Sequence, residues 1–339
     1  MVRQPRNHRE TRHDFNKFSR AGRVQRDNRD ARAHSKQGFY RRSLLSPIPR
    51  AANPAKIPRC PLSRLIKPNV GANQRSTTKY QLFSDYHTHP QGHRVQRYTQ
   101  TLLQPWADSA RNLGLTDIAF TDHDRYHPGI DFDEIDRLRE RNPDLRIRAG
   151  IELDNDPIHS TVGRNWIEKH WDKLDFVLGS IHFLDRPDQM FDSVPDGAAQ
   201  FKGRNVDAMY ANYFGRVREI AATGLIDCLA HLDLIKIHGH RPSAEIGGLV
   251  NETLDFIRAQ NLAIELSTAG WRKPVNEPYP GNRIIELAMQ KGIPFTTASD
   301  AHSHAQLGDK FATLAQRMES FGIQEVCVFQ GHKRSQLLL

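Results

Sequence analysis

The sequence predicts an α/β fold: a distorted barrel of seven strand–helix units that follows a disordered basic tail. Two features of residues 80–330 predict the barrel. Short apolar runs with strand character alternate with amphipathic stretches of helical length, which produces parallel strands joined by right-handed crossovers. Nearly every run also ends in a histidine or an acidic residue, and a barrel gathers the carboxyl ends of all its strands around one mouth. An open sheet concentrates its site at one switch point instead.

The apolar runs predict the strands in order: Tyr80–Phe83, Thr116–Thr121, Leu145–Ile151, Phe176–Ser180, Ile226–Ala230, Leu262–Ser267 and Ile293–Ser299. The predicted helices lie between them at 98–113, 133–141, 160–173, 206–223, 249–260 and 282–291. Gly114 and Pro143 end the first two helices, because glycine adopts the left-handed conformation of a helix end and proline cannot continue a helix. Seven units are one fewer than usual, so we expect a distorted or incompletely closed barrel. A further strand is predicted at Glu325–Phe329.

The net charge of +9 belongs to the amino-terminal part of the chain. Residues 1–80 carry 20 Lys and Arg against 4 Asp and Glu, whereas the remainder carries 28 against 35. Residues 1–75 have few large apolar residues, no sustained hydrophobic period and several prolines, so they cannot bury enough surface to offset the entropy of ordering. We therefore predict a disordered basic tail over 1–75 and a barrel domain over 80–330.

Three interpretations of the tail stay open. It could bind nucleic acid or anionic surfaces without specificity. It could be an organelle transit peptide, although the amphipathic period of such peptides is missing. The true start site could also lie downstream of Met1. We favour an appendage without a catalytic role.

Composition excludes several classes of protein. The three cysteines are far apart and form no CxxC pair, so they give neither a disulfide framework nor a thiolate zinc site, and they suit a reducing cytoplasm. No run approaches 18 apolar residues, and the amino terminus lacks the apolar segment of a secretory signal. We expect a cytoplasmic protein without a membrane partner.

Metal-ligating side chains follow the predicted strands. Two histidines one residue apart on an extended segment, as in His87 and His89, point the same way. Eight such residues stand just after apolar runs: His87, His89, His123, Glu152, His182, His231, Asp300 and His302. His93, in the loop after His89, is a ninth candidate. Loops at strand ends do not select imidazoles and carboxylates by chance, so the series predicts a metal centre.

The ligand count exceeds what one ion takes. A catalytic zinc takes three protein ligands and a water, so eight or nine ligands predict two or three divalent ions that share a bridging carboxylate. Imidazole with carboxylate suits zinc, iron or manganese. Such clusters bind anionic esters, lower the pKa of a bridging water and stabilise an in-line displacement. We therefore expect a phosphate ester hydrolase in which a metal-bridging hydroxide attacks phosphorus.

The motifs HTH, TDHD, GIE, GSIH, AHLD and SDAH resemble those of the PHP (polymerase and histidinol phosphatase) metallophosphoesterases over roughly residues 80–310. The resemblance implies a distorted (β/α)7 barrel with three metals. It assigns His87, His89, Glu152 and Asp300 to one metal, His93, His123 and His302 to the second, and Glu152, His182 and His231 to the third. Asp300, His302 and Glu152 are the expected catalytic residues, with Asp300 or a histidine handling the proton.

Three segments are most similar to the histidinol-phosphatase branch, which hydrolyses L-histidinol phosphate in histidine biosynthesis. They are Gly179–Asp185, His231–Lys236 and Ser267–Gly281. The loop His87–His93 is shorter than in that branch, and Trp271 also differs from it.

Other residues are expected to support the site. Arg272 and Lys273 follow a strand end without a nearby acid, so they are candidates to bind the phosphate, with Arg97 and Arg94 as weaker candidates. Asp122 and Asp233 could orient His123 and His231, or could cap the following helices.

Two rival functions remain. One is a PHP phosphoesterase with another substrate, such as a 3′–5′ nuclease or a nucleotide or sugar phosphatase. The acidic body argues against a nucleic-acid groove, which needs a basic stripe, and favours a small phosphate ester. The other rival is a non-catalytic metal-binding module, which the intact ligand series disfavours.

Overall fold

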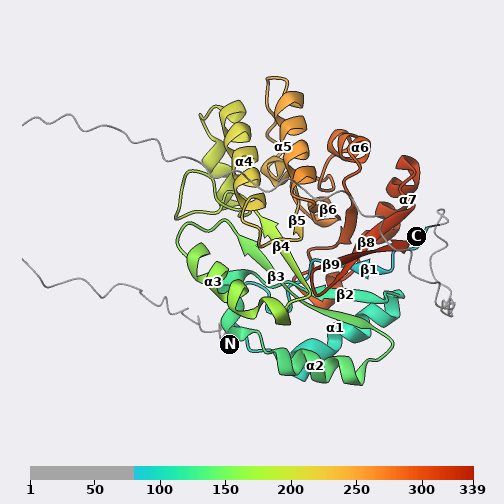
Figure 1. Cartoon of the computed structure of the whole chain (residues 1–339). Helices are drawn as coiled ribbons and strands as arrows, with labels where there is room; N and C mark the ends of the chain where they lie inside the picture. The colour runs from blue at the N-terminus through green and yellow to red at the C-terminus, as the bar shows by residue number, and fades with distance from the viewer. Residues whose placement is uncertain (1–79) are drawn as a thin grey trace, which may run out of the picture. The chain divides into compact units, whose positions relative to one another are not determined.

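The computed structural model describes residues 80–339, so the predicted tail over 1–75 lies outside the described residues. Seven parallel strands form one sheet in the order of the sequence (Figure 1). They are β1 (Ser84–Asp85), β2 (Asp117–Phe120), β3 (Arg146–Asp154), β4 (Phe176–Ser180), β5 (Cys228–Leu229), β6 (Ala263–Ser267) and β7 (Phe295–Ala298). A parallel sheet in which each strand pairs with the next along the chain is the topology of a (β/α) barrel.

Hydrogen bonds between the first and last strands bring the sheet round to a nearly closed barrel. The backbone N–H of Tyr86 donates to Thr297 at 2.9 Å, and that of His89 donates to Ala301 at 2.7 Å. Thr88 pairs with Ala301 as an isolated parallel bridge. The predicted distorted (β/α)7 barrel is therefore confirmed.

Helices connect the strands and cover the outside of the barrel (Figure 1). They are α1 (Gln100–Leu113), α2 (Phe132–Arg141), α3 (Ser160–His170), α4 (Val206–Ala221), α5 (Gly247–Ala259), α6 (Asn282–Gln290) and α7 (Phe311–Phe321). In α1, the residues Leu103, Trp106 and Ala110 are buried at helical spacing. Gly114 ends this helix with a φ of 75°, which glycine adopts without a steric penalty.

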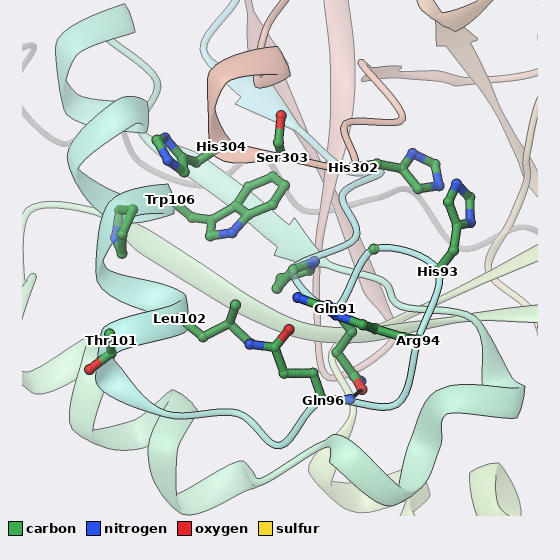
Figure 2. A pocket seen from close by; sticks show the side chains of 13 residues that line it. Gln91, His93, Arg94, Gln96, Thr101, Leu102, Trp106, His302, Ser303 and His304 are labelled. Atoms are coloured by element: carbon green, nitrogen blue, oxygen red, sulfur yellow. Dashed lines mark hydrogen bonds between the residues drawn. The ribbon is translucent and has the colours of Figure 1, made fainter. Parts of the chain in front are cut away.

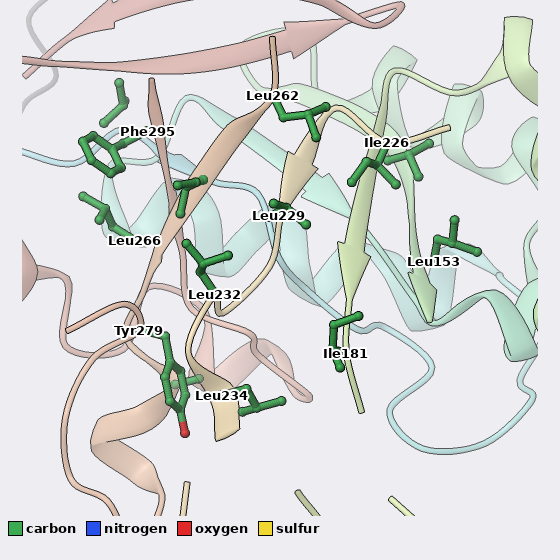
Figure 3. Packing of buried hydrophobic residues seen from close by; sticks show 14 of the residues in the cluster. Leu153, Ile181, Ile226, Leu229, Leu232, Leu234, Leu262, Leu266, Tyr279 and Phe295 are labelled. Atoms are coloured by element: carbon green, nitrogen blue, oxygen red, sulfur yellow. The ribbon is translucent and has the colours of Figure 1, made fainter. Parts of the chain in front are cut away.

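Apolar side chains of the strands and helices form the main core between the two layers. Figure 3 shows Leu153, Leu229, Leu266 and Phe295 within it. Each of these side chains is at most 5% exposed. Burial of a leucine or phenylalanine contributes about 2–3 kcal/mol, so this layer is what holds the strands in register and fixes their carboxyl ends.

Two predicted strand boundaries change in the structure, and one helix is added. The first strand forms at Ser84–Asp85 rather than at Tyr80–Phe83, because Ser84 pairs with Asp117 of β2. Strand β3 extends to Asp154, so Glu152 lies within the strand instead of after it. Helix α7 was not expected from the sequence.

The predicted strand at Glu325–Phe329 is confirmed as β8 (Glu325–Gln330), but it lies outside the barrel sheet. It forms an antiparallel hairpin with β9 (Lys333–Leu338). Phe329 packs against Tyr86 and Phe176, with ring centroids 5.9 and 4.6 Å away. Because Phe176 begins β4, the hairpin fills the amino-terminal end of the barrel, which we call the base.

No helix within residues 80–339 is long and apolar enough to cross a membrane.

Candidate metal centre

The predicted ligands meet at the carboxyl ends of the strands, which we call the mouth. His87 and His89 follow β1, His123 follows β2, His182 follows β4 and His231 follows β5. Glu152 projects from β3, and Asp300 and His302 follow β7. Because side chains alternate along a strand, Glu152 and Asp154 face the same way, into the barrel. Six strands far apart in the sequence thus place their ligands at one point.

Glu152 is the centre of this arrangement and is fully buried. Its Oε2 lies 3.2 Å from His87 Nε2, 3.4 Å from His89 Nε2 and 2.9 Å from His123 Nδ1. Its Oε1 lies 3.3 Å from His231 Nε2 and 3.8 Å from His182 Nε2. The two oxygens of one carboxylate therefore face two different sets of imidazoles, which is the geometry of a bridging ligand.

Asp300 and His302 complete the side of the cluster nearest β7. Asp300 Oδ1 lies 3.2 Å from His89 Nε2 and 3.7 Å from His87 Nε2. The ring of His302 lies 4.3 Å from the ring of His89 and 4.3 Å from that of His93. The structure thus brings His93 to the site, where the short loop after His89 carries it. We call these residues the cluster: His87, His89, His93, His123, Glu152, His182, His231, Asp300 and His302.

The pKa values in the cluster follow from packing many imidazoles around two carboxylates. Burial alone would raise the pKa of Glu152, but His123 and His87 hold it well below its usual range. Burial and the nearby His302 ring lower the pKa of His89, and burial lowers that of His302 to about 4. The carboxylates and the neutral rings of His89 and His302 are thus in the state that binds metal ions at pH 7. For His87 and His123, burial would lower the pKa, but the nearby carboxylates raise it well above its usual value, so binding of a metal ion would displace a proton from these two rings.

Unpaired polar atoms show that the cluster fits divalent metals. His87 Nε2, both ring nitrogens of His89, both oxygens of Glu152 and His302 Nε2 are buried without a hydrogen-bond partner. Buried polar groups nearly always have a partner, and each exception requires an explanation. Ligand atoms of His87, His89 and Glu152 lie within 4.8 Å of one another, as do those of His89, His123 and His302. Nitrogen and oxygen donors without thiolate are the ligands of a divalent-metal site.

Two carboxylates behind the cluster orient its imidazoles, and the sequence reasoning missed both. Glu265 Oε2 lies 2.8 Å from His87 Nδ1, and its Oε1 accepts the backbone N–H of His231 at 2.8 Å. Asp154 Oδ1 lies 2.7 Å from His182 Nδ1 and 3.2 Å from His123 Nδ1. A carboxylate on the second ring nitrogen fixes the tautomer of a metal-ligating histidine, as for His87 and His182, whose Nε2 atoms face Glu152. The Nδ1 atom of His123 faces both Glu152 and Asp154. The signal was available, because both are acids at inward positions of buried strands.

Arg125 is a further residue that was not predicted. Its guanidinium forms an ion pair with Asp154 and is mostly buried. Burial would lower the pKa of Arg125, but Asp154 raises it above its usual value. Arg125 therefore holds Asp154 in place behind two imidazoles.

Asp122 and Asp233, the two acids predicted to orient His123 and His231, make different contacts in the structure. Asp122 lies 3.9 Å from His89 Nδ1 and accepts a 2.6 Å hydrogen bond from Tyr98, so it faces His89 rather than His123. Asp233 accepts the backbone N–H of Gly281 at 2.9 Å and pairs with Lys236 at 2.8 Å. It holds the loop before α6 beside His231 instead of orienting that ring.

The predicted phosphate-binding cations lie in different positions. Arg272 donates to the carbonyl oxygens of Ser299 and Asp300, at 2.6 and 3.0 Å, so it supports the backbone that presents Asp300. Lys273 lies close enough to contribute to the lowered pKa of His93, whose main cause is burial. Arg97 is 79% exposed and pairs with Asp131 at 2.9 Å, so it points away from the cluster.

A cavity of about 600 Å³ opens beside the cluster. Figure 2 shows it with His93 and His302 on one side and Trp106 of α1 on the other. Arg94 and His304 also line it, and its volume lies in the range of small-molecule sites. The cluster is therefore accessible to a small substrate from this side.

Known proteins share both the sequence and the fold. The "Probable histidinol-phosphatase" of Deinococcus radiodurans is 31% identical over 236 residues, which cover 64% of this chain and 86% of that protein. The histidinol-phosphatase of Bacillus subtilis is 25% identical over 252 residues, which cover 63% of this chain and 92% of that protein.

A solved histidinol phosphate phosphatase from Lactococcus lactis, in complex with zinc, L-histidinol and phosphate, has the same fold. Its TM-score is 0.59 at 19% identity, and the match covers 76% of this chain and 100% of that one. Residues 85–269 match the PHP domain family, and this range carries seven of the nine cluster residues, all except Asp300 and His302. The chain therefore belongs to the PHP domain family.

Proposed function

We propose that this chain is a metal-dependent phosphomonoesterase that hydrolyses L-histidinol phosphate to L-histidinol and phosphate, a step of histidine biosynthesis. One observation carries the proposal: the two oxygens of Glu152 lie 2.9–3.8 Å from five imidazoles. The similarity to the Deinococcus radiodurans protein, which covers 86% of that protein, supports the substrate. The substrate is a small phosphate ester rather than a nucleic acid, because the barrel domain is acidic.

The cluster would hold two or three divalent ions. His87, His89, Glu152 and Asp300 would hold one, His93, His123 and His302 the second, and Glu152, His182 and His231 the third. Zinc, manganese and iron all suit these donors, and the Lactococcus lactis protein supports zinc. When bound, such ions neutralise phosphate oxygens and lower the pKa of a water molecule.

The chain's own residues prepare the site for this chemistry. Burial would raise the pKa of Asp300, but His87 and His302 hold it well below its usual range, so its carboxylate is ionised at pH 7 and available to a metal ion. Arg272 holds the backbone carbonyl of Asp300, and the φ of Asp300 is 52°. This left-handed conformation is uncommon outside glycine and directs the carboxylate toward His89.

His302 and Glu152 would also act on the substrate's phosphate through the metals they hold. Lys273, beside His93, is the cation that we propose to contact the phosphate. The predicted cytoplasmic location and the predicted lack of a catalytic role for residues 1–75 stay predictions.

An assay with two substrates tests the proposed function. We expect the metal-loaded full chain to hydrolyse L-histidinol phosphate with a kcat/KM at least a hundredfold above that for a 3′-terminated oligonucleotide, measured by phosphate or nucleotide release. Faster hydrolysis of the oligonucleotide would support a nuclease of the same family. No hydrolysis of any phosphate ester, with fewer than two metal ions per chain, would support a non-catalytic module.

A further inference from the structure

Three residues beside the cluster, Asp192, Asp233 and Tyr279, carry unpaired polar atoms, and we call them the acidic group. Asp192 Oδ1, Asp233 Oδ1 and Tyr279 Oη are buried and have no hydrogen-bond partner within the described residues. Tyr279 is only 1% exposed, and a buried tyrosine hydroxyl usually has a partner. None of these atoms belongs to the ligand sets described above.

The acidic group adjoins the part of the cluster that contains His182 and His231. Asp192 Oδ2 lies 3.9 Å from His182 Nε2, and the ring of Tyr279 lies 6.3 Å from that of His231. Figure 3 shows the hydroxyl of Tyr279 beyond the carboxyl ends of β4 and β5, where the arrowheads point. Asp192 and Tyr279 therefore lie next to two residues of the cluster.

The loop that carries Asp192 is anchored, so the position of the carboxylate is defined. The preceding residue, Phe191, is fully buried, and its N–H donates to the carbonyl of His182 at 3.0 Å. The carbonyl of Phe191 lies 2.8 Å from His238 Nε2. Phe191, the residue before Asp192, is thus held through both its N–H and its carbonyl group.

The acidic group carries negative charge that one cation offsets in part. Burial raises the pKa of Tyr279, and the negative charges of Asp233, Asp192 and Asp300 raise it further, whereas Lys236 Nζ lies 5.2 Å from the centre of the Tyr279 ring. Asp233 has Lys236 as a partner at 2.8 Å. No Lys or Arg among residues 80–339 lies within 4.0 Å of the carboxylate of Asp192.

We infer that Asp192, together with Tyr279 and Asp233, binds the ammonium group of the substrate, an inference that rests on the proposed function. In L-histidinol phosphate the amine is on the carbon next to the ester carbon, so it lies close to a phosphate bound at the cluster. An ammonium group has three N–H donors, and the acidic group offers three unpaired acceptors. On the side of the mouth near His93, the positive charges of Arg94 and Lys273 would disfavour a cation. The two sides thus set the orientation of the substrate.

The test compares L-histidinol phosphate with its deaminated analogue, 3-(imidazol-4-yl)propyl phosphate. For the full-length, metal-loaded wild type we expect a kcat/KM ratio of about 10 to 100 in favour of the amine, the usual range for hydrogen bonds to a charged group. In Asp192→Asn this ratio should fall to near 1, mainly through a higher KM for the amine, with unchanged metal content. Asp188→Asn, an exposed acid of the same loop, should keep the wild-type ratio.

Each outcome of this comparison supports or overturns the inference about Asp192. A ratio that stays high in Asp192→Asn, or a wild-type ratio near 1, overturns the inference and leaves the proposed function standing. Loss of metal ions in Asp192→Asn assigns that residue to the metals and also overturns it. If the wild type hydrolyses neither ester but hydrolyses other phosphate esters, the proposed function fails.

Discussion

The mouth and the base of the barrel contain similar residues in opposite states. At the base, Asp117 accepts hydrogen bonds from Tyr86, Arg146 and Arg148 at 2.8–3.0 Å. The hydroxyl of Tyr86 also accepts the N–H of Phe329 at 2.8 Å. At the mouth, both oxygens of Glu152 and both ring nitrogens of His89 have no hydrogen-bond partner.

This difference separates stability from function within one barrel. A fully paired buried network stabilises the fold that contains it, whereas unpaired buried groups destabilise it unless a ligand satisfies them. The base therefore holds the strands together, and the mouth is prepared for ions that complete it. Substitutions at the two ends should consequently affect different measurements.

The largest effect is expected for Glu152→Gln at the mouth. The substitution removes the charge that faces five imidazoles, and metal ions supply several kcal/mol of transition-state stabilisation. We expect kcat/KM for L-histidinol phosphate to fall by roughly 10³-fold or more, with metal content reduced in elemental analysis. Glu168→Gln, an exposed glutamate of α3, is the matched control. Full activity in Glu152→Gln would remove the basis for the bridging role.

The next effect is expected at the base, for Asp117→Ala. Arg148 is 8% exposed, and removal of its partner leaves a buried charge unpaired, which costs about 3–5 kcal/mol. Denaturant unfolding should show this loss, while kcat of the folded fraction stays close to wild type. Asp136→Ala, which breaks an exposed pair with Arg139, should cost less than about 1 kcal/mol. Equal losses in the two variants would contradict the stabilising role of the base.

A smaller effect is expected for Glu265→Gln. Glu265 lies in β6 and supports the mouth through its contact with His87. The amide can still accept one hydrogen bond but no longer favours a charged His87 ring or a strongly basic Nε2. Substitution of such supporting carboxylates lowers metal affinity or activity by about 10- to 100-fold. Metal titration of the apoprotein measures this, and an affinity equal to that of wild type would show that Glu265 is only structural.

The smallest effect is expected for His332→Gln in the hairpin at the base, where the change in Tm should depend on pH. Burial would lower the pKa of His332, but its hydrogen bond to Asp227 raises it above the ordinary 6.5. The stabilisation from this charged pair is therefore complete below about pH 6.5 and is lost as the pH rises through the raised value. We expect His332→Gln to lower Tm by a few degrees at pH 6 and by less at pH 9. A Tm difference between wild type and variant that grows with pH would contradict a stabilising, positively charged His332.

The sequence predicts the mouth of the barrel much better than the base. The mouth was predictable because each ligand stands at the end of an apolar run, and strand ends meet in a barrel. The base was not, because the roles of Tyr86 and Asp117 depend on a hairpin more than 200 residues away in the sequence. The boundaries of β1 and β3 were missed for a similar reason, since pairing with β2 and β4 decides them.

The supporting residues show the same limit. Glu265 and Asp154 could be recognised as acids in buried strands, but only the closed barrel shows which imidazole each one faces. Asp122 was predicted beside His123, its neighbour in sequence, yet it faces His89 on an adjacent strand. Contacts across the barrel, not along the chain, determine these pairs.

The number of metal ions per chain tests the central claim most directly. Elemental analysis of the purified full-length wild type and of Glu152→Gln, each equilibrated with zinc and freed of loosely bound ions, gives this number. We predict at least two ions per wild-type chain and a loss of at least one in Glu152→Gln. A wild type that hydrolyses L-histidinol phosphate with one ion or none, or a Glu152→Gln variant with the full number, would contradict a metal centre bridged by Glu152.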